Sequence, residues 1–150
     1  MNAIKTKVIE AIREELNERL EVSTQAYNDA KESRNNDTKS SAGDKYETSR
    51  AMMQQEMDNA EVSIHQVKMF KNELQRLPVE EESDIVISGS LVETDKGLYF
   101  LGLSLGKIEV DNQIIYAIST ASPLGKLLLH KNVGDEINLN NMKQSILSIC

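Results

Sequence analysis

The chain has 150 residues, enough for one medium domain or two small ones, and its low aromatic content (4%, no tryptophan) predicts a small compact core. The formal net charge of -7 argues against free binding to a nucleic-acid backbone, which usually requires a strongly cationic surface. The one cysteine, Cys150, cannot form an internal disulfide, and the two distant histidines, His65 and His130, argue against a zinc site.

The chain begins with MNAIKTKVIEAIREE, which reaches acidic side chains too early for a signal peptide. No apolar run approaches the roughly 18–20 residues of a membrane span. We therefore expect a cytoplasmic protein with no membrane partner.

Residues 1–34 contain no glycine or proline, and their apolar and small residues recur at steps of three or four. This spacing predicts one long amphipathic helix with a single stripe that packs against a partner. The stripe consists of Ile9, Ile12, Leu16, Leu20, Ser23, Tyr27 and Ala30.

Residues 35–43, NNDTKSSAG, interrupt this helix, because their side chains compete with helix through local hydrogen bonds or backbone freedom. A second helix is predicted from about residue 44 to residue 77, with a stripe in alternating steps of four and three, the mark of a heptad repeat. Its stripe consists of Met53, Met57, Ala60, Ile64, Val67, Lys71 and Leu74.

Neither helix is apolar all round, so each needs a partner, and the short interruption favours an antiparallel neighbour. We predict an antiparallel coiled-coil hairpin over residues 1–78, with an acidic tip near residues 40–48. Each arm would be roughly 50 Å long. Folding the chain about residue 40 brings Leu20 near Ala60, Leu16 near Ile64 and Ile12 near Val67.

Pro78 ends the second helix, and residues 79–150 have a β-rich pattern. Runs typical of strands are DIVISGSLVETD, GLYFLGLSLG, KIEV, QIIYAIS, VGDEINL and SILSI, with turn signals at TDKG and DN. SPLGKLLLH predicts a short helix with Ser122 as N-cap and Pro123 at its first position. The fold class is therefore α+β: a helical hairpin followed by a small, mainly antiparallel sheet with one short helix.

Asp44 and Glu47 lie three residues apart at the start of the second helix. They could be ordinary helix caps, because acids are favoured near the positive end of a helix dipole and this spacing is close to a capping box. The same spacing puts both carboxylates on one face, where they could hold a Mg²⁺ if other ligands were already in place.

Two motifs resemble the bacterial Gre transcript-cleavage factors. The segment AGDKYETSRAMMQQEMDNAEVSIHQVKMFKNELQRL is similar to the second coiled-coil arm of that family, with its G-D-x-x-E tip. The segment AISTASPLGKLLLHKNVGDEI is similar to the signature of the family's C-terminal domain. Both motifs occur in the family's order and spacing, and together they cover most of the chain.

The resemblance implies an FKBP-like domain over residues 79–150 that docks on the rim of the RNA polymerase secondary channel, with Ser122, Pro123 and Leu124 as polymerase-binding residues. It implies that Asp44 and Glu47 enter the channel as the catalytic tip carboxylates. There they would share a second Mg²⁺ with the polymerase, which then cleaves backtracked RNA.

On this reading the chain is an accessory factor and not an enzyme in its own right. It would have no cofactor of its own and no small-molecule substrate, and it would meet the 3′ end of the nascent RNA only indirectly. Lys45 and Arg50, beside the tip acids, are candidate contacts to RNA or polymerase, or else ordinary solvated residues at a helix start.

The chain departs from the family pattern after the second acid, where it reads ETSR in place of E-N-A-x-Y, with Tyr46 between the acids. This departure motivates a second hypothesis, a non-cleaving regulator that plugs the channel and inhibits or pauses transcription. A third hypothesis is a coiled-coil adaptor with no role at the polymerase, in which Asp44 and Glu47 are caps only.

Overall fold

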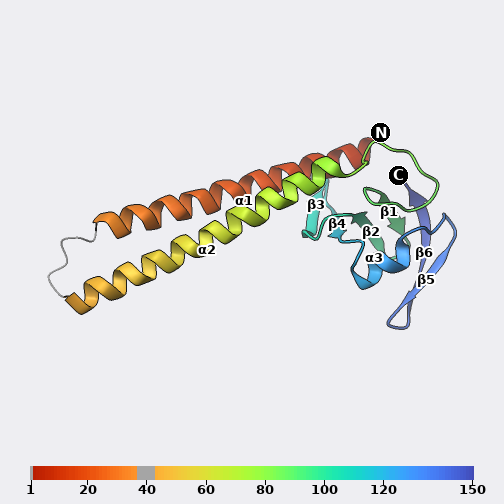
Figure 1. Cartoon of the computed structure of the whole chain (residues 1–150). Coiled ribbons are helices and arrows are strands. Elements are labelled where there is room, and N and C mark those ends of the chain that lie inside the picture. Colours follow the sequence, from red (N-terminus) through yellow and green to blue (C-terminus); the bar gives the residue numbers. More distant parts are fainter. Residues whose placement is uncertain (1, 37–42) are drawn as a thin grey trace. The chain divides into compact units, whose positions relative to one another are not determined.

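The computed structural model describes residues 2–36 and 43–150, and for residues 43–45 it describes the backbone alone. The interruption predicted over residues 35–43 is wrong at its ends, where Asn35, Asn36 and Gly43 are helical; its remaining residues, 37–42, and with them part of the predicted tip, lie outside the described residues. Two long helices are followed by a six-stranded, mostly antiparallel sheet and one short helix (Figure 1). The predicted α+β class is therefore confirmed.

The two long helices are α1 (Ala3–Asn36) and α2 (Gly43–Arg76). Tertiary contacts divide the chain into two compact units, the first made of Met1–Arg13 with Asn72–Cys150 and the second of Glu14–Lys71. Within the second unit, α1 and α2 run side by side in opposite directions, as predicted (Figure 1). Among the described residues, no helix combines the length and the apolar character that crossing a membrane requires.

The stripe predicted for each helix is withdrawn from solvent along its whole length. Every one of its members is buried or half-buried, including the polar Lys71. The most deeply buried members, each less than a tenth exposed, are Ile9, Ile12, Leu16 and Ala30 in α1 and Met57, Ala60, Val67 and Leu74 in α2. The period of three to four residues read from the sequence is therefore the period of the packed face.

The register between the two helices differs from the predicted one. Arg34 Nη1 donates a hydrogen bond to Gln54 Oε1 at 2.6 Å, whereas folding about residue 40 would place Arg34 opposite Tyr46. This contact is offset by eight residues from the predicted pairing, about 12 Å at 1.5 Å per residue, which is close to one heptad. A slip of one heptad again places stripe against stripe, which is why the apolar pattern could not distinguish the two registers.

The sheet in the first unit has the strand order β3-β4-β2-β1-β6-β5. All neighbouring strands are antiparallel except β2 and β4, which are parallel. The strands are β1 (Leu91–Thr94), β2 (Gly97–Leu101), β3 (Gly106–Val110), β4 (Gln113–Ile118), β5 (Glu136–Leu139) and β6 (Met142–Ile149), and the short helix α3 (Pro123–Leu128) follows β4.

Two of the predicted strands are at least five residues shorter than the runs that suggested them, and in each case a glycine with positive φ marks the limit. The first run begins at residue 84, but β1 begins only at Leu91, after Gly89 with a φ of 92°. The second run continues to residue 106, but β2 ends at Leu101, before Gly102 with a φ of 128°. Apolar composition alone does not reveal these backbone turns, because glycine is also found inside strands.

Asparagine-rich turns close two of the hairpins. Asp111 and Asn112, between β3 and β4, have φ angles of 50° and 64°, as the DN signal predicted. Asn140 and Asn141, between β5 and β6, have almost the same angles, 51° and 64°. Two-residue turns with both φ angles positive match the twist of antiparallel strands, and Asn and Asp tolerate this region better than most residues.

The α3 helix packs against a closed apolar cluster of the sheet. Leu128 of α3 is fully buried with Val86, Val92, Leu101 and Ile146, each at most 1% exposed. Burial of side chains this size contributes roughly 1.5–3 kcal/mol each relative to exposure. This cluster therefore fixes the position of α3 on the sheet.

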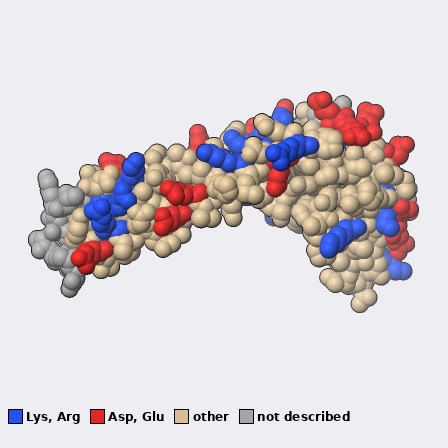
Figure 2. Space-filling view, in the orientation of Figure 1, with Lys and Arg blue, Asp and Glu red and all other residues tan. Residues whose placement is uncertain are grey.

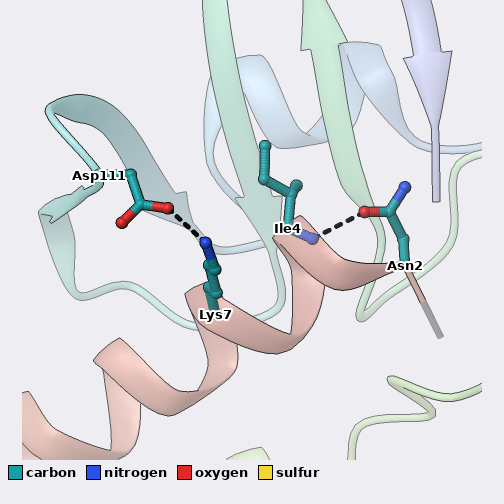
Figure 3. Close-up of polar contacts among 4 residues, drawn as sticks. All are labelled: Asn2, Ile4, Lys7 and Asp111. Atoms are coloured by element: carbon teal, nitrogen blue, oxygen red, sulfur yellow. Dashed lines mark hydrogen bonds and ion pairs between the residues drawn. The ribbon is translucent and has the colours of Figure 1, made fainter.

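The N-terminal turn of α1 is tied to the sheet within the first unit (Figure 3). Asn2 Oδ1 accepts a hydrogen bond from the backbone N–H of Ile4 at 2.8 Å, which caps the helix start. Lys7 Nζ lies 2.7 Å from Asp111 Oδ2 in the β3–β4 turn. Both side chains of this ion pair are more than half exposed, so the contact orients the helix start more than it stabilises the fold.

Acidic side chains gather on the first unit over the segment that follows α2 (Figure 2). Glu80, Glu81, Glu82 and Asp84 are all exposed there, and none belongs to an ion pair found within the described residues. This acidic segment directly follows Pro78, where the second helix was predicted to end.

A buried polar network lies under the β1–β2 turn. Gln144 Oε1 accepts hydrogen bonds from Thr94 Oγ1 at 2.8 Å and from the Tyr99 hydroxyl at 3.2 Å. All three residues are less than a tenth exposed. Burial raises the pKa of Tyr99 above its ordinary value of 10.0.

We expect the substitution Tyr99→Phe to remove a component of the tyrosinate absorbance titration that lies above the ordinary tyrosine range. Because the pKa of Tyr99 is raised in the folded state, the protonated hydroxyl contributes fully to the stability of the native state below about pH 10. This contribution is lost as the pH rises through the folded-state pKa of Tyr99. The control Tyr116→Phe should leave the late component in place, and a titration unchanged in Tyr99→Phe would contradict the assignment.

Candidate functional site

The start of α2 carries the predicted tip residues. The helix begins at Gly43, so Asp44 lies in its first turn and Glu47 about one turn later. The side chains of Asp44 and Lys45 lie outside the described part of the chain. Glu47 is exposed and belongs to none of the ion pairs found within that part.

Tyr46 and Arg50 form a pair next to Glu47. Arg50 Nη1 donates a hydrogen bond to the Tyr46 hydroxyl at 2.8 Å, across one turn of α2. Tyr46 is half-buried and lies in line with the heptad stripe, seven residues before Met53. The pair therefore links the surface of the first turns to the packed face of the hairpin, and it fixes the arginine that the sequence singled out as a candidate contact.

The face of α2 that carries the acids differs from the face that packs against α1. Glu47 is one residue after Tyr46, so the helical period of about 100° per residue turns its side chain away from the stripe. Asp44, three residues before Glu47, occupies a helix position close to the same face. The first turns of α2 therefore present the Glu47 carboxylate to solvent, while Tyr46 lies on the packed side of the helix.

The second predicted site, the start of α3, is held by a compact hydrogen-bond cap. Ser122 Oγ accepts a hydrogen bond from the Gly125 backbone N–H at 3.0 Å and donates one to the Ser119 carbonyl oxygen at 2.6 Å. Pro123 follows at the first helical position, which confirms the predicted cap. The Ser122 hydroxyl is therefore engaged within the chain.

The other residues at the start of α3 divide between surface and core. Pro123 is exposed, and so is Ala121 before the cap. Leu124 is half-buried and packs against the apolar cluster under α3. Of the three predicted polymerase-binding residues, Pro123 is the one whose side chain lies open to solvent, and Ser122 and Leu124 hold it in place.

Gly125 is essential to this arrangement, and sequence reasoning did not single it out. A Cβ atom at this position would overlap the Ser119 carbonyl oxygen and would lie 2.8 Å from Ser122 Oγ. The helix can approach the preceding loop this closely only without a side chain. The signal was present in the SPLG segment, but composition does not distinguish a glycine needed for close packing from one that is tolerated.

The two predicted sites belong to different units, the start of α2 to the second and the start of α3 to the first. Within the ranges that the structure describes, no three or more His, Cys, Asp or Glu side chains gather as a metal site. No protein-family model matches the chain, and no curated protein shows significant similarity to it.

Proposed function

We propose that the protein is a Gre-like accessory factor of RNA polymerase that enters the secondary channel and stimulates cleavage of backtracked RNA. The observation that carries the proposal is the exposed carboxylate of Glu47 at the start of a 34-residue helix, three residues after Asp44. Two acids near the end of a long helical hairpin are suited to reach a cavity that a compact domain cannot enter.

In this proposal the catalytic cavity belongs to the polymerase, and the chain contributes ligands to it. Glu47 and Asp44 would hold one Mg²⁺ together with carboxylates of the polymerase. Carboxylate oxygens fit this ion, which usually takes only one or two such ligands and keeps several waters. When bound, the metal supplies an activated water for phosphodiester hydrolysis.

Residues 79–150 would dock on the channel rim through the start of α3, as the resemblance to the FKBP-like domain of the Gre factors suggests. The exposed Pro123 on a fixed cap supports this role, because a rigid surface loses little conformational entropy on binding. Arg50 would remain tied to Tyr46 and present its cation beside the acids, where RNA phosphate or polymerase carboxylates could meet it.

The test is a cleavage assay on a halted, backtracked elongation complex with radiolabelled RNA. We expect the full-length protein to shorten the RNA from its 3′ end in the presence of Mg²⁺ and to co-elute with the polymerase on gel filtration. Unchanged RNA together with no co-elution would reject a role at the polymerase and favour a coiled-coil adaptor.

A non-cleaving channel regulator is the second candidate, and the Tyr46–Arg50 hydrogen bond favours it. The bond holds a guanidinium within one turn of Glu47, where a positive charge competes with a metal ion for the carboxylate. In the same assay this candidate predicts unchanged RNA, co-elution with the polymerase and slower elongation after nucleotides are restored.

A further inference from the structure

One face of the hairpin is hollowed along much of the second unit. Two adjoining depressions between α1 and α2 share Val22, Ser23 and Ser63, so they form one continuous groove. On α1 the groove extends from Glu15 to Ser33, about 27 Å at 1.5 Å per residue. A helix of about 18 residues has this length.

Small side chains cause the hollow. Ala30 and Ala60 are buried residues of the groove lining with small side chains, and the small Ser23 and Ser63 are half-buried. The Ser63 hydroxyl donates to the Asn59 carbonyl oxygen at 3.2 Å, so it bonds to its own helix and does not fill the gap. Val22 remains 64% exposed at the middle of the groove. Two helices alone therefore leave this part of the apolar seam open.

The borders of the groove are acidic. Glu15 forms an ion pair with Arg19 at 2.8 Å. The other acids on the borders are Glu18, Asp29 and Glu56, and none of them belongs to an ion pair found among the described side chains. If a second copy packed groove to groove about a two-fold axis, the acidic borders of one copy would face the acidic borders of the other. Like charges held opposite one another oppose such a dimer, whereas a basic partner is favoured.

We propose that this groove binds an amphipathic helix of a partner protein, with a stripe of small and apolar residues that lies on Val22 and the seam and with Lys or Arg on both sides of the stripe. A third helix would cover the exposed valine and complete a three-helix packing. Its cations would face Glu18, Asp29 and Glu56. This docking surface is separate from the acids at the start of α2 and from the start of α3.

The test uses the full chain and two synthetic helical peptides of about 20 residues, long enough to cover the groove. Both carry the same Ala and Leu stripe, one with lysines beside it and the other with glutamates at the same places. We expect fluorescence anisotropy to show binding of the lysine peptide and at least tenfold weaker binding of the glutamate peptide.

Charge reversal on the protein gives the sharper comparison. The groove variant combines Glu18→Lys, Asp29→Lys and Glu56→Lys. The control combines Glu32→Lys, Glu61→Lys and Glu73→Lys, which are exposed, lie outside the groove and change the net charge equally. We expect the groove variant to bind the glutamate peptide more tightly than the lysine peptide. The control variant should still bind the lysine peptide more tightly.

Filling the groove tests the apolar part of the proposal. Ser63→Leu should weaken lysine-peptide binding at least tenfold while circular dichroism shows unchanged helix content. Equal loss in both charge-reversed proteins, or no binding of either peptide, would overturn the proposal. A further contradicting outcome would be a parent protein that sediments as a dimer and a Ser63→Leu variant that sediments as a monomer. The groove would then be occupied by a second copy of the chain.

Discussion

Neutralising both acids at the start of α2, with Asp44→Asn and Glu47→Gln, is expected to reduce cleavage of backtracked RNA by about 100-fold or more. The expectation rests on the proposed function: these carboxylates would be direct ligands of the shared Mg²⁺, and losing even an outer partner of a metal site costs about 10–100-fold. Amides keep the size of the side chains and remove the negative charge. The measurement is the single-turnover rate of RNA shortening in a purified backtracked complex.

Binding separates this chemical effect from a loss of docking. The double variant should bind polymerase within about twofold of the parent, because every residue of the docking surface proposed at the start of α3 is unchanged. The matched control is Glu61→Gln, an exposed acid farther along α2, which should cleave as the parent does. If the double variant cleaves at the parental rate, the tip does not supply the metal ligands.

The substitution Gly125→Ala is expected to lower the free energy of unfolding of the sheet unit by about 3 kcal/mol, at the upper end of the usual cost of overpacking. The added methyl group would overlap the Ser119 carbonyl oxygen, and a backbone atom cannot rotate away. The helix α3 must therefore move, which breaks the Ser122 cap and exposes Leu128. Urea unfolding followed by near-UV circular dichroism measures the change.

Gly97→Ala provides the matched control for this prediction. A Cβ at Gly97 would meet nothing closer than the Tyr99 hydroxyl at 3.5 Å, which is ordinary van der Waals contact. The same chemical change should therefore alter the unfolding free energy by less than about 1 kcal/mol. Equal stability of Gly125→Ala and Gly97→Ala would show that α3 can shift at little cost.

Because α3 carries Pro123, Gly125→Ala should also weaken polymerase docking.

The helices, their packed faces and the cap of α3 were predictable because each depends on residues close together in the chain. The stripe from Ile9 to Ala30 repeats at the helical period, and Ser122 followed by Pro123 is a local start signal. The strand limits at Gly89 and Gly102 were missed because apolar residues resume shortly after each glycine, at Leu91 and Leu103. For the candidate site, the spacing of Asp44 and Glu47 was readable, but the hydrogen bond between Tyr46 and Arg50 was not.

Periodicity and local signals in the chain were enough to define a helical hairpin, a mainly antiparallel sheet and two motifs that carry a functional hypothesis. The one-heptad shift of α1 along α2 depended on tertiary packing, since both registers set apolar residues against apolar residues. The acidic groove around Ser23 and Ser63 also emerged only from the packed helices. Small residues look like acceptable core residues in a sequence, and only the distance between two real helix surfaces decides whether they close a seam or leave it open.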